Sequence, residues 1–128
     1  MKALLDTHAF LWWVTDDSRL SERAREIIGD GRNDIFFSAA SAWEIAIKAR
    51  LRKVQVPGDF ERFITDQLQL NDFRVLAVEL AHALHVRALP DHHRDPFDRL
   101  LVAQSRIERL PIVGCDAQLK PYGVELVW

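Results

Sequence analysis

Short apolar runs alternate along this chain with longer segments in which apolar residues recur every three or four positions. The short runs predict buried strands, and the longer segments predict amphipathic helices. The strands are expected at residues 3–5, 35–37, 73–76, 111–113 and 123–127. The helices are expected at residues 8–14, 18–28, 39–51, 57–70, 78–89 and 95–108. This alternation predicts an α/β fold, with a mostly parallel central sheet flanked by helices on both faces.

Two helices carry the clearest apolar stripes. We expect the helix that follows residue 38 to bury Ala39, Trp43, Ile47 and Leu51. We expect the helix that begins at residue 95 to bury Leu100, Leu101, Ala103 and Ile107. No internal repeat, low-complexity segment or linker separates these elements, so residues 1–128 are expected to form a single domain.

Four carboxylates stand where such a fold carries its chemistry. Asp6 follows the first predicted strand and Asp116 the fourth, and parallel strands bring their carboxyl ends to one edge of the sheet. Glu44 and Asp98 lie in two of the predicted helices. Carboxylates that converge repel one another unless one takes up a proton or a cation binds between them. Mg²⁺ and Mn²⁺ prefer such oxygen ligands, so the pattern indicates a divalent metal site.

Each of these acids also has a purely structural explanation. Asp6 and Asp116 both precede helical segments and can serve as N-caps, as can Asp95 before a proline. Glu44 and Lys48 lie four residues apart on a helix, which is the spacing of a surface ion pair. Sequence spacing alone leaves both explanations open.

Composition limits the partners that this chain can bind. The 17 Lys and Arg residues and 19 Asp and Glu residues give a formal net charge of −2, so any contact with a nucleic acid must rest on local basic side chains. The candidates for such contacts are Lys48, Arg52, His93 and Arg99. A single cysteine, Cys115, cannot form an internal disulfide, which favours the reducing cytoplasm. No apolar run reaches the roughly 20 residues that span a membrane.

The candidate acids occur within four distinctive segments. These are LLDTH at 4–8 followed by LWW at 11–13, SAASAWEIAIK at 38–48, HRDPFDRLLVAQ at 93–104, and the stretch from IV at 112–113 through Asp116 to Trp128. In this order the segments resemble the PIN-domain ribonucleases of the VapC toxin family. The resemblance implies a PIN-like α/β/α sandwich. It also implies a Mg²⁺- or Mn²⁺-dependent endoribonuclease that acts as the toxin of a type II VapBC toxin–antitoxin system.

The same resemblance implies roles for individual residues. Asp6 and Asp98 correspond to direct metal ligands, and Glu44 and Asp116 complete the pocket through water or a second ion. Thr7 is implied to orient Asp6 by hydrogen bonding, and Asp95 to cap the helix beside the site. The family commonly has Ser or Thr two residues before its last acid. This chain has Gly114 there, so a hydroxyl that would orient the Asp116 carboxylate or a water is missing.

The implied partners are an RNA substrate, a VapB-type antitoxin and a second copy of the chain in a homodimer, within a larger toxin–antitoxin assembly. One alternative is a PIN fold that has lost catalysis and only binds. Another is a single-domain phosphoacceptor receiver, which requires an acceptor Asp after the third strand, where this chain has Ala77. Structural zinc is disfavoured, because His82, His85, His92 and His93 with Cys115 lack the spacing of zinc ligands.

Overall fold

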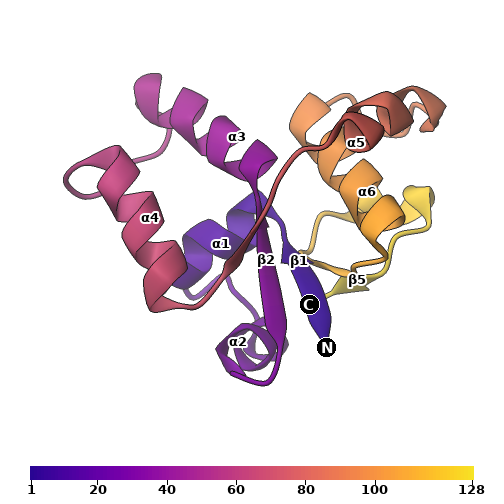
Figure 1. The fold of residues 1–128 in the computed structure, drawn as a ribbon. Coiled ribbons are helices and arrows are strands. Elements are labelled where there is room, and N and C mark those ends of the chain that lie inside the picture. The colour runs from indigo at the N-terminus through magenta and orange to yellow at the C-terminus, as the bar shows by residue number, and fades with distance from the viewer.

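Every strand pairing in the central sheet is parallel. The computed structural model describes residues 1–128, and its five strands lie in the order β3-β2-β1-β4-β5. The strands are β1 (Lys2–Leu5), β2 (Asp34–Ser38), β3 (Arg74–Leu76), β4 (Ile112–Val113) and β5 (Leu126–Val127). Each predicted strand is present, and helices cover both faces of the sheet (Figure 1). The predicted α/β/α architecture is therefore confirmed.

The helices follow the predicted order, with shifted ends. They are α1 (Thr7–Val14), α2 (Glu22–Gly29), α3 (Ala39–Arg50), α4 (Phe60–Leu70), α5 (Leu80–His85) and α6 (Pro96–Glu108). Two 3₁₀ helices, η1 (Val86–Ala88) and η2 (Ala117–Tyr122), follow α5 and β4. The helix expected at 78–89 is thus a short α-helix continued by a 3₁₀ turn. No helix has the combination of length and apolar character that crossing a bilayer requires.

Side chains of the strands alternate between two apolar cores. Leu5, Phe37 and Val113 point into the larger core, which α1, α2 and α4 close. Leu4 and Ile112, each one residue away along its strand, point into the smaller core beneath α6. This period of two is what a sheet covered on both faces requires. The sheet is thereby fixed between its two helical layers.

Polar side chains define where most of the helices begin. Asp6, Ser38, Asp59 and Asp95 each accept a hydrogen bond from a backbone N–H in the first turn of the following helix. Because the Asp59 carboxylate accepts from the Arg62 N–H at 2.9 Å, α4 begins at residue 60 and not at residue 57 as predicted.

The predicted inward face of α3 is wrong. Trp43 is 60% exposed and packs its ring edge-to-face on Phe97, with ring centroids 5.0 Å apart, and Ile47 and Leu51 are also exposed. The buried residues of α3 are Ala40, Ser41, Glu44 and Ile45. Small and polar side chains occupy this face because α3 approaches α1 closely and turns Glu44 inward. In α6, likewise, Ile107 is exposed, and the buried residues include Gln104 and Ser105.

This correction can be tested with two isoleucines on the same helix. Ile45 is 0% exposed and Ile47 is 38% exposed. We expect Ile45→Ala to lower the free energy of unfolding by about 2–5 kcal/mol, because it leaves a cavity in the larger core. Ile47→Ala, the matched control, is expected to cost less than about 1 kcal/mol. Urea denaturation of both variants measures the difference, and equal losses would contradict the assigned face of α3.

Candidate active site

The carboxyl ends of β1 and β4 bring the two strand-end acids together. Leu5 pairs with Val113, and the Asp6 N–H donates to the Val113 carbonyl at 3.0 Å. Asp116 follows shortly after β4, whereas α3 and α6 supply Glu44 and Asp98. These four side chains line a cavity of about 70 Å³, which we call the acidic pocket. The remaining residues that line it are Thr7, His8, Lys48 and Asp95.

Crowding and burial shift the protonation of two of these acids. Burial raises the pKa of Asp6 to about 7, and the negative charges of Asp98, Asp116 and Glu44 add to this rise. The N–H of Ala9, which donates to Asp6 Oδ1, acts in the opposite direction. The pKa of Asp98 rises to about 6, again chiefly through burial. At neutral pH the pocket therefore holds carboxylates that favour a bound proton or cation.

Glu44 is held by two side chains, Thr7 and Lys48. Thr7 Oγ1 lies 2.7 Å from Glu44 Oε1 and 3.0 Å from Ser41 Oγ, and Lys48 Nζ lies 2.6 Å from Glu44 Oε2. The implied contact between Thr7 and Asp6 is therefore wrong. Thr7 is the first residue of α1 and its side chain faces α3, so it orients Glu44. The Lys48–Glu44 pair lies in the pocket wall and is not a surface pair, since the Glu44 carboxylate is buried.

Asp95 caps α6 at the edge of the pocket, as its position before Pro96 predicted. Its Oδ1 accepts from the N–H groups of Phe97 and Asp98 at 2.8 and 3.0 Å. This cap fixes the first turn of α6, from which the Asp98 side chain enters the pocket. Asp6 and Asp116 also cap the segments that follow them. The capping explanation is therefore confirmed for all three residues, and each of them also lines the acidic pocket.

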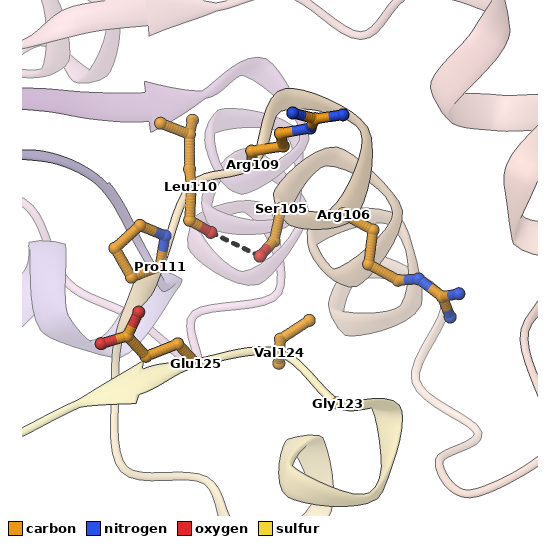
Figure 2. A pocket seen from close by; sticks show the side chains of 8 residues that line it. All are labelled: Ser105, Arg106, Arg109, Leu110, Pro111, Gly123, Val124 and Glu125. Atoms are coloured by element: carbon orange, nitrogen blue, oxygen red, sulfur yellow. Dashed lines mark hydrogen bonds between the residues drawn. The ribbon is translucent and has the colours of Figure 1, made fainter.

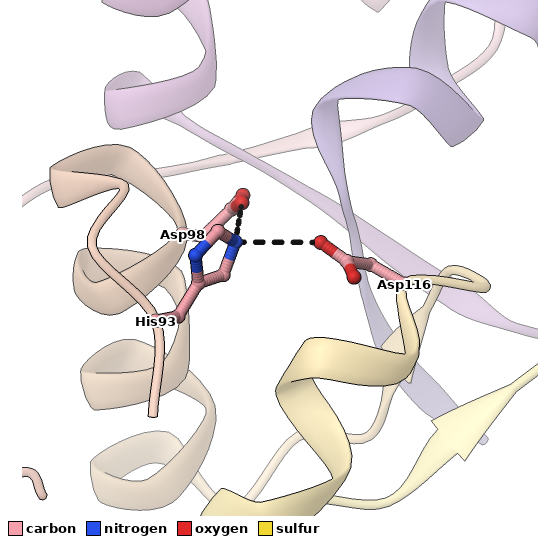
Figure 3. A group of neighbouring side chains, drawn as sticks. All are labelled: His93, Asp98 and Asp116. Carbon is pink, nitrogen blue, oxygen red and sulfur yellow. Dashed lines mark ion pairs between the residues drawn. The ribbon is translucent and has the colours of Figure 1, made fainter. Parts of the chain in front are cut away.

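His93 lies beside the acidic pocket and contacts two of its acids, whereas the sequence suggested only a possible RNA contact. Its Nε2 lies 2.9 Å from Asp98 Oδ2 and 3.4 Å from Asp116 Oδ2 (Figure 3). The segment before α6 brings the ring there, because the His93 N–H donates to the Tyr122 hydroxyl at 2.8 Å. The only sequence signal was its closeness to Asp95 and Asp98.

The basic candidates divide into two groups. The Arg99 guanidinium donates to four backbone carbonyls and to the Tyr122 hydroxyl, and only 14% of the side chain is exposed. Arg99 is therefore a clamp for the segment before α6, and these hydrogen bonds leave little of its guanidinium for a phosphate. Lys48 is half-buried against Glu44, and Arg52 is exposed beyond the end of α3.

Gly114 allows a close approach that no other residue would allow. A Cβ built at this position would lie 2.7 Å from Asp6 Cγ and closer still to Oδ2. The sequence suggested that the missing hydroxyl at residue 114 would affect Asp116. In the structure the neighbour of Gly114 is Asp6, whose carboxylate packs directly against the backbone there.

A separate cavity of about 350 Å³ lies at the other end of α6 (Figure 2). It is lined by Arg106, Arg109 and Glu125, together with Ser105, Leu110, Pro111, Gly123 and Val124. Its only carboxylate is Glu125, and it borders the starts of β4 and β5, away from the edge where the four acids meet. Of the two cavities, only the acidic pocket gathers several carboxylates.

The chain is similar to a known protein family, to a curated ribonuclease and to several solved structures. The family model described as PIN domain matches residues 3–124. Ribonuclease VapC16 of Mycobacterium tuberculosis is 44% identical over 64 residues, which span 50% of this chain and 45% of that protein. The fold also matches three solved structures that are at most 17% identical in sequence.

Two of these structures contain bound DNA. VapBC2 from Rickettsia felis, bound to a DNA fragment from its promoter, matches with a TM-score of 0.72 and 13% identity, covering 98% of this chain and 97% of that chain. FitAB bound to an IR36 DNA fragment has a TM-score of 0.68 and 17% identity, covering 98% and 93%. FitAcB from Neisseria gonorrhoeae has a TM-score of 0.63 and 17% identity, covering 98% and 96%.

The raised pKa of Asp6 predicts how the metal-free protein responds to pH. An acid whose pKa is higher in the folded than in the unfolded chain binds an extra proton when folded, so stability falls as pH rises through that window. For Asp6 the window runs from 3.8 to about 7. Asp17 and Asp30, with pKa values lowered to about 2, change stability only at more acidic pH.

In EDTA, we therefore expect Asp6→Asn to be more stable than the wild type at pH 8 by roughly 1–3 kcal/mol. At pH 4 the two proteins are expected to be nearly equal. Asparagine can still accept the Ala9 N–H, so the cap of α1 is retained. Urea denaturation across this pH range measures the effect. An Asp6→Asn variant less stable than the wild type at pH 8 would contradict the charge crowding described here.

The contact between Gly114 and Asp6 predicts that substitutions at the two positions are coupled. Gly114→Ala is expected to cost about 1–3 kcal/mol in the wild type, because the new methyl group displaces the Asp6 carboxylate. The cost is expected to shrink in an Asp6→Ala background, where the clash is absent. Gly31→Ala serves as the control, since nothing lies within 4 Å of a Cβ at residue 31. Equal costs in both backgrounds would show that the contact does not exist.

Proposed function

The chain belongs to the PIN-domain family, and we propose that it is a divalent-metal-dependent endoribonuclease that serves as the toxin of a toxin–antitoxin pair. The observation that carries this proposal is the acidic pocket, in which four carboxylates from distant parts of the chain converge. The similarity to Ribonuclease VapC16 supports RNA as the substrate, although the matched region spans less than half of that protein. The expected compartment is the cytoplasm, as the single cysteine also favours.

The donor set of the acidic pocket fits Mg²⁺ or Mn²⁺. It offers several carboxylate oxygens, and burial together with the neighbouring negative charges raises the pKa values of Asp6 and Asp98, so a bound cation would favour their charged forms. We assign Asp6 and Asp98 as direct ligands, with Glu44 and Asp116 acting through water or at a second ion. When bound, such a cation supplies Lewis acidity toward a phosphodiester oxygen and lowers the pKa of water.

The other residues of the pocket prepare this arrangement. Thr7 and Lys48 hold the two oxygens of Glu44 in place, so the carboxylate keeps one orientation while substrate binds. The Ala9 N–H donates to Oδ1 of Asp6, so Oδ2 of Asp6 is not engaged by this hydrogen bond. Asp116 is the most exposed of the four acids, and it marks the side from which a phosphodiester can enter. Lys48 and Arg52 are the remaining candidates for phosphate contacts at the rim.

A VapB-type antitoxin and a second copy of this chain are the proposed protein partners. The likeness in fold to the toxin–antitoxin complexes VapBC2 and FitAB, over 98% of this chain, supports the first. Exposed apolar side chains on α5 support a homodimer, because Leu80 and Leu84 are 73% and 66% exposed. A larger toxin–antitoxin assembly would combine the two contacts.

RNA cleavage by the purified, antitoxin-free protein tests the proposed activity. We expect discrete fragments with Mg²⁺ or Mn²⁺ and none with EDTA. Asp6→Asn and Asp98→Asn are each expected to reduce cleavage by about 100-fold or more, because each removes a charged group aimed at the reaction centre. Asp66→Asn, which changes an exposed acid on α4, is the matched control and is expected to cleave normally.

Two results would contradict the proposal. Cleavage that survives both substitutions would place the reaction outside the acidic pocket. RNA or antitoxin binding without cleavage, by folded protein that has bound metal, would favour the catalytically inactive PIN module. The convergence of all four acids supports the active form over this alternative.

A further inference from the structure

His93 has the geometry of a metal ligand. Its Nε2 and one carboxylate oxygen each from Asp98 and Asp116 all lie within 4.8 Å of one another. Nε2 lies 2.9 Å from the first oxygen and 3.4 Å from the second. Neighbouring ligands of an octahedral ion with bonds of about 2.1 Å lie about 3 Å apart, which these separations approach. Figure 3 shows the two carboxylates approaching the same ring nitrogen from different directions.

Hydrogen bonding does not account for this nitrogen. His93 Nε2 is buried and forms no hydrogen bond, although an Asp98 oxygen lies only 2.9 Å away. The in-plane direction along which Nε2 could form a hydrogen bond therefore points at neither the Asp98 oxygen nor the Asp116 oxygen. The ring edge that carries Nε2 faces both the Asp98 and the Asp116 carboxylate, which is the position of a shared ligand to one ion. Buried polar atoms without a partner are rare, so this one calls for an explanation.

The backbone around His93 holds the ring in this position before any ion binds. The His93 N–H donates to the Tyr122 hydroxyl at 2.8 Å, and the His93 carbonyl accepts from Arg99 at 3.3 Å. Arg99 also donates to the Tyr122 hydroxyl at 3.1 Å, so the His93 backbone, Arg99 and Tyr122 are joined pairwise by hydrogen bonds that form a clamp. This clamp joins the segment before α6 to η2, on which Asp116 is the N-cap. The donors on the two segments are thus fixed relative to each other.

We infer that His93 coordinates the cation of the acidic pocket together with Asp98 and Asp116, and that its nitrogen makes the pocket prefer Mn²⁺ to Mg²⁺. The inference rests on the proposed metal dependence and deepens it. Mg²⁺ is bound almost entirely by oxygen, whereas Mn²⁺ shares its preference for carboxylates but also accepts an imidazole nitrogen. Coordination through Nε2 requires the proton on Nδ1. The long contact of 3.4 Å from the Asp95 N–H to Nδ1 would then be lost.

Mn²⁺ binding to the full chain tests this inference without relying on activity. Pulsed electron paramagnetic resonance of the Mn²⁺-loaded protein is expected to show nitrogen hyperfine coupling, which is absent in His93→Gln. Calorimetric titration is expected to show that His93→Gln weakens Mn²⁺ binding by about tenfold or more, with a smaller loss for Mg²⁺. His92→Gln is the matched control, because His92 is the exposed neighbour whose ring packs on Tyr122.

The outcomes separate this inference from the proposed function. Tight Mn²⁺ binding without nitrogen coupling, or coupling that survives in His93→Gln, overturns the role of His93 and leaves the carboxylate site standing. Equal effects of His93→Gln on Mn²⁺ and Mg²⁺ affinity overturn the metal preference. A wild-type protein that binds neither ion overturns both the inference and the proposed metal dependence. Circular dichroism of each variant shows whether it is folded.

Discussion

The structure depends on placing several carboxylates where water cannot fully solvate them. Parallel pairing of β1 with β4 sets Asp6 beside the segment that carries Asp116, and α3 and α6 add Glu44 and Asp98. Burial and mutual repulsion then raise the pKa of Asp6 to about 7 and that of Asp98 to about 6. A fold that keeps such groups together in the absence of a cation is less stable than it would otherwise be. Binding of the proposed cation would offset this cost, which would link the stability of the pocket to its proposed use.

Local hydrogen bonds hold the carboxylates in this arrangement, and each of these bonds uses one oxygen of a carboxylate. Asp6 caps α1 with one oxygen and packs its other oxygen against Gly114. Glu44 accepts from Thr7 with one oxygen and from Lys48 with the other. A carboxylate in this pocket can therefore stabilise the fold and still line the proposed cation site. The capping and functional explanations, which the sequence left as alternatives, are two aspects of one geometry.

The sequence predicted the strands, the order of the helices and the α/β/α architecture, because periodicity is a local property. It predicted which acids follow strands for the same reason. It gave the wrong inward face for α3, since Trp43 and Ile47 are more apolar than Ser41 and Glu44 but lie on the outer side. Hydrophobic spacing cannot reveal that a helix turns its polar side toward a site.

The remaining errors concern contacts between residues that are distant in sequence. Thr7 meets Glu44 across 37 positions, and Arg99 reaches Tyr122 across 23. The segment before α6 places the His93 ring beside the acidic pocket and ties the Arg99 guanidinium to the backbone. Sequence spacing does not reveal the path of this segment.

The most direct test is diffraction from crystals grown with Mn²⁺, measured at the manganese absorption edge. We expect an anomalous peak from bound manganese within bonding distance of the Asp98 carboxylate. An ordered acidic pocket with no such peak, in crystals that bind Mn²⁺ elsewhere, would contradict it.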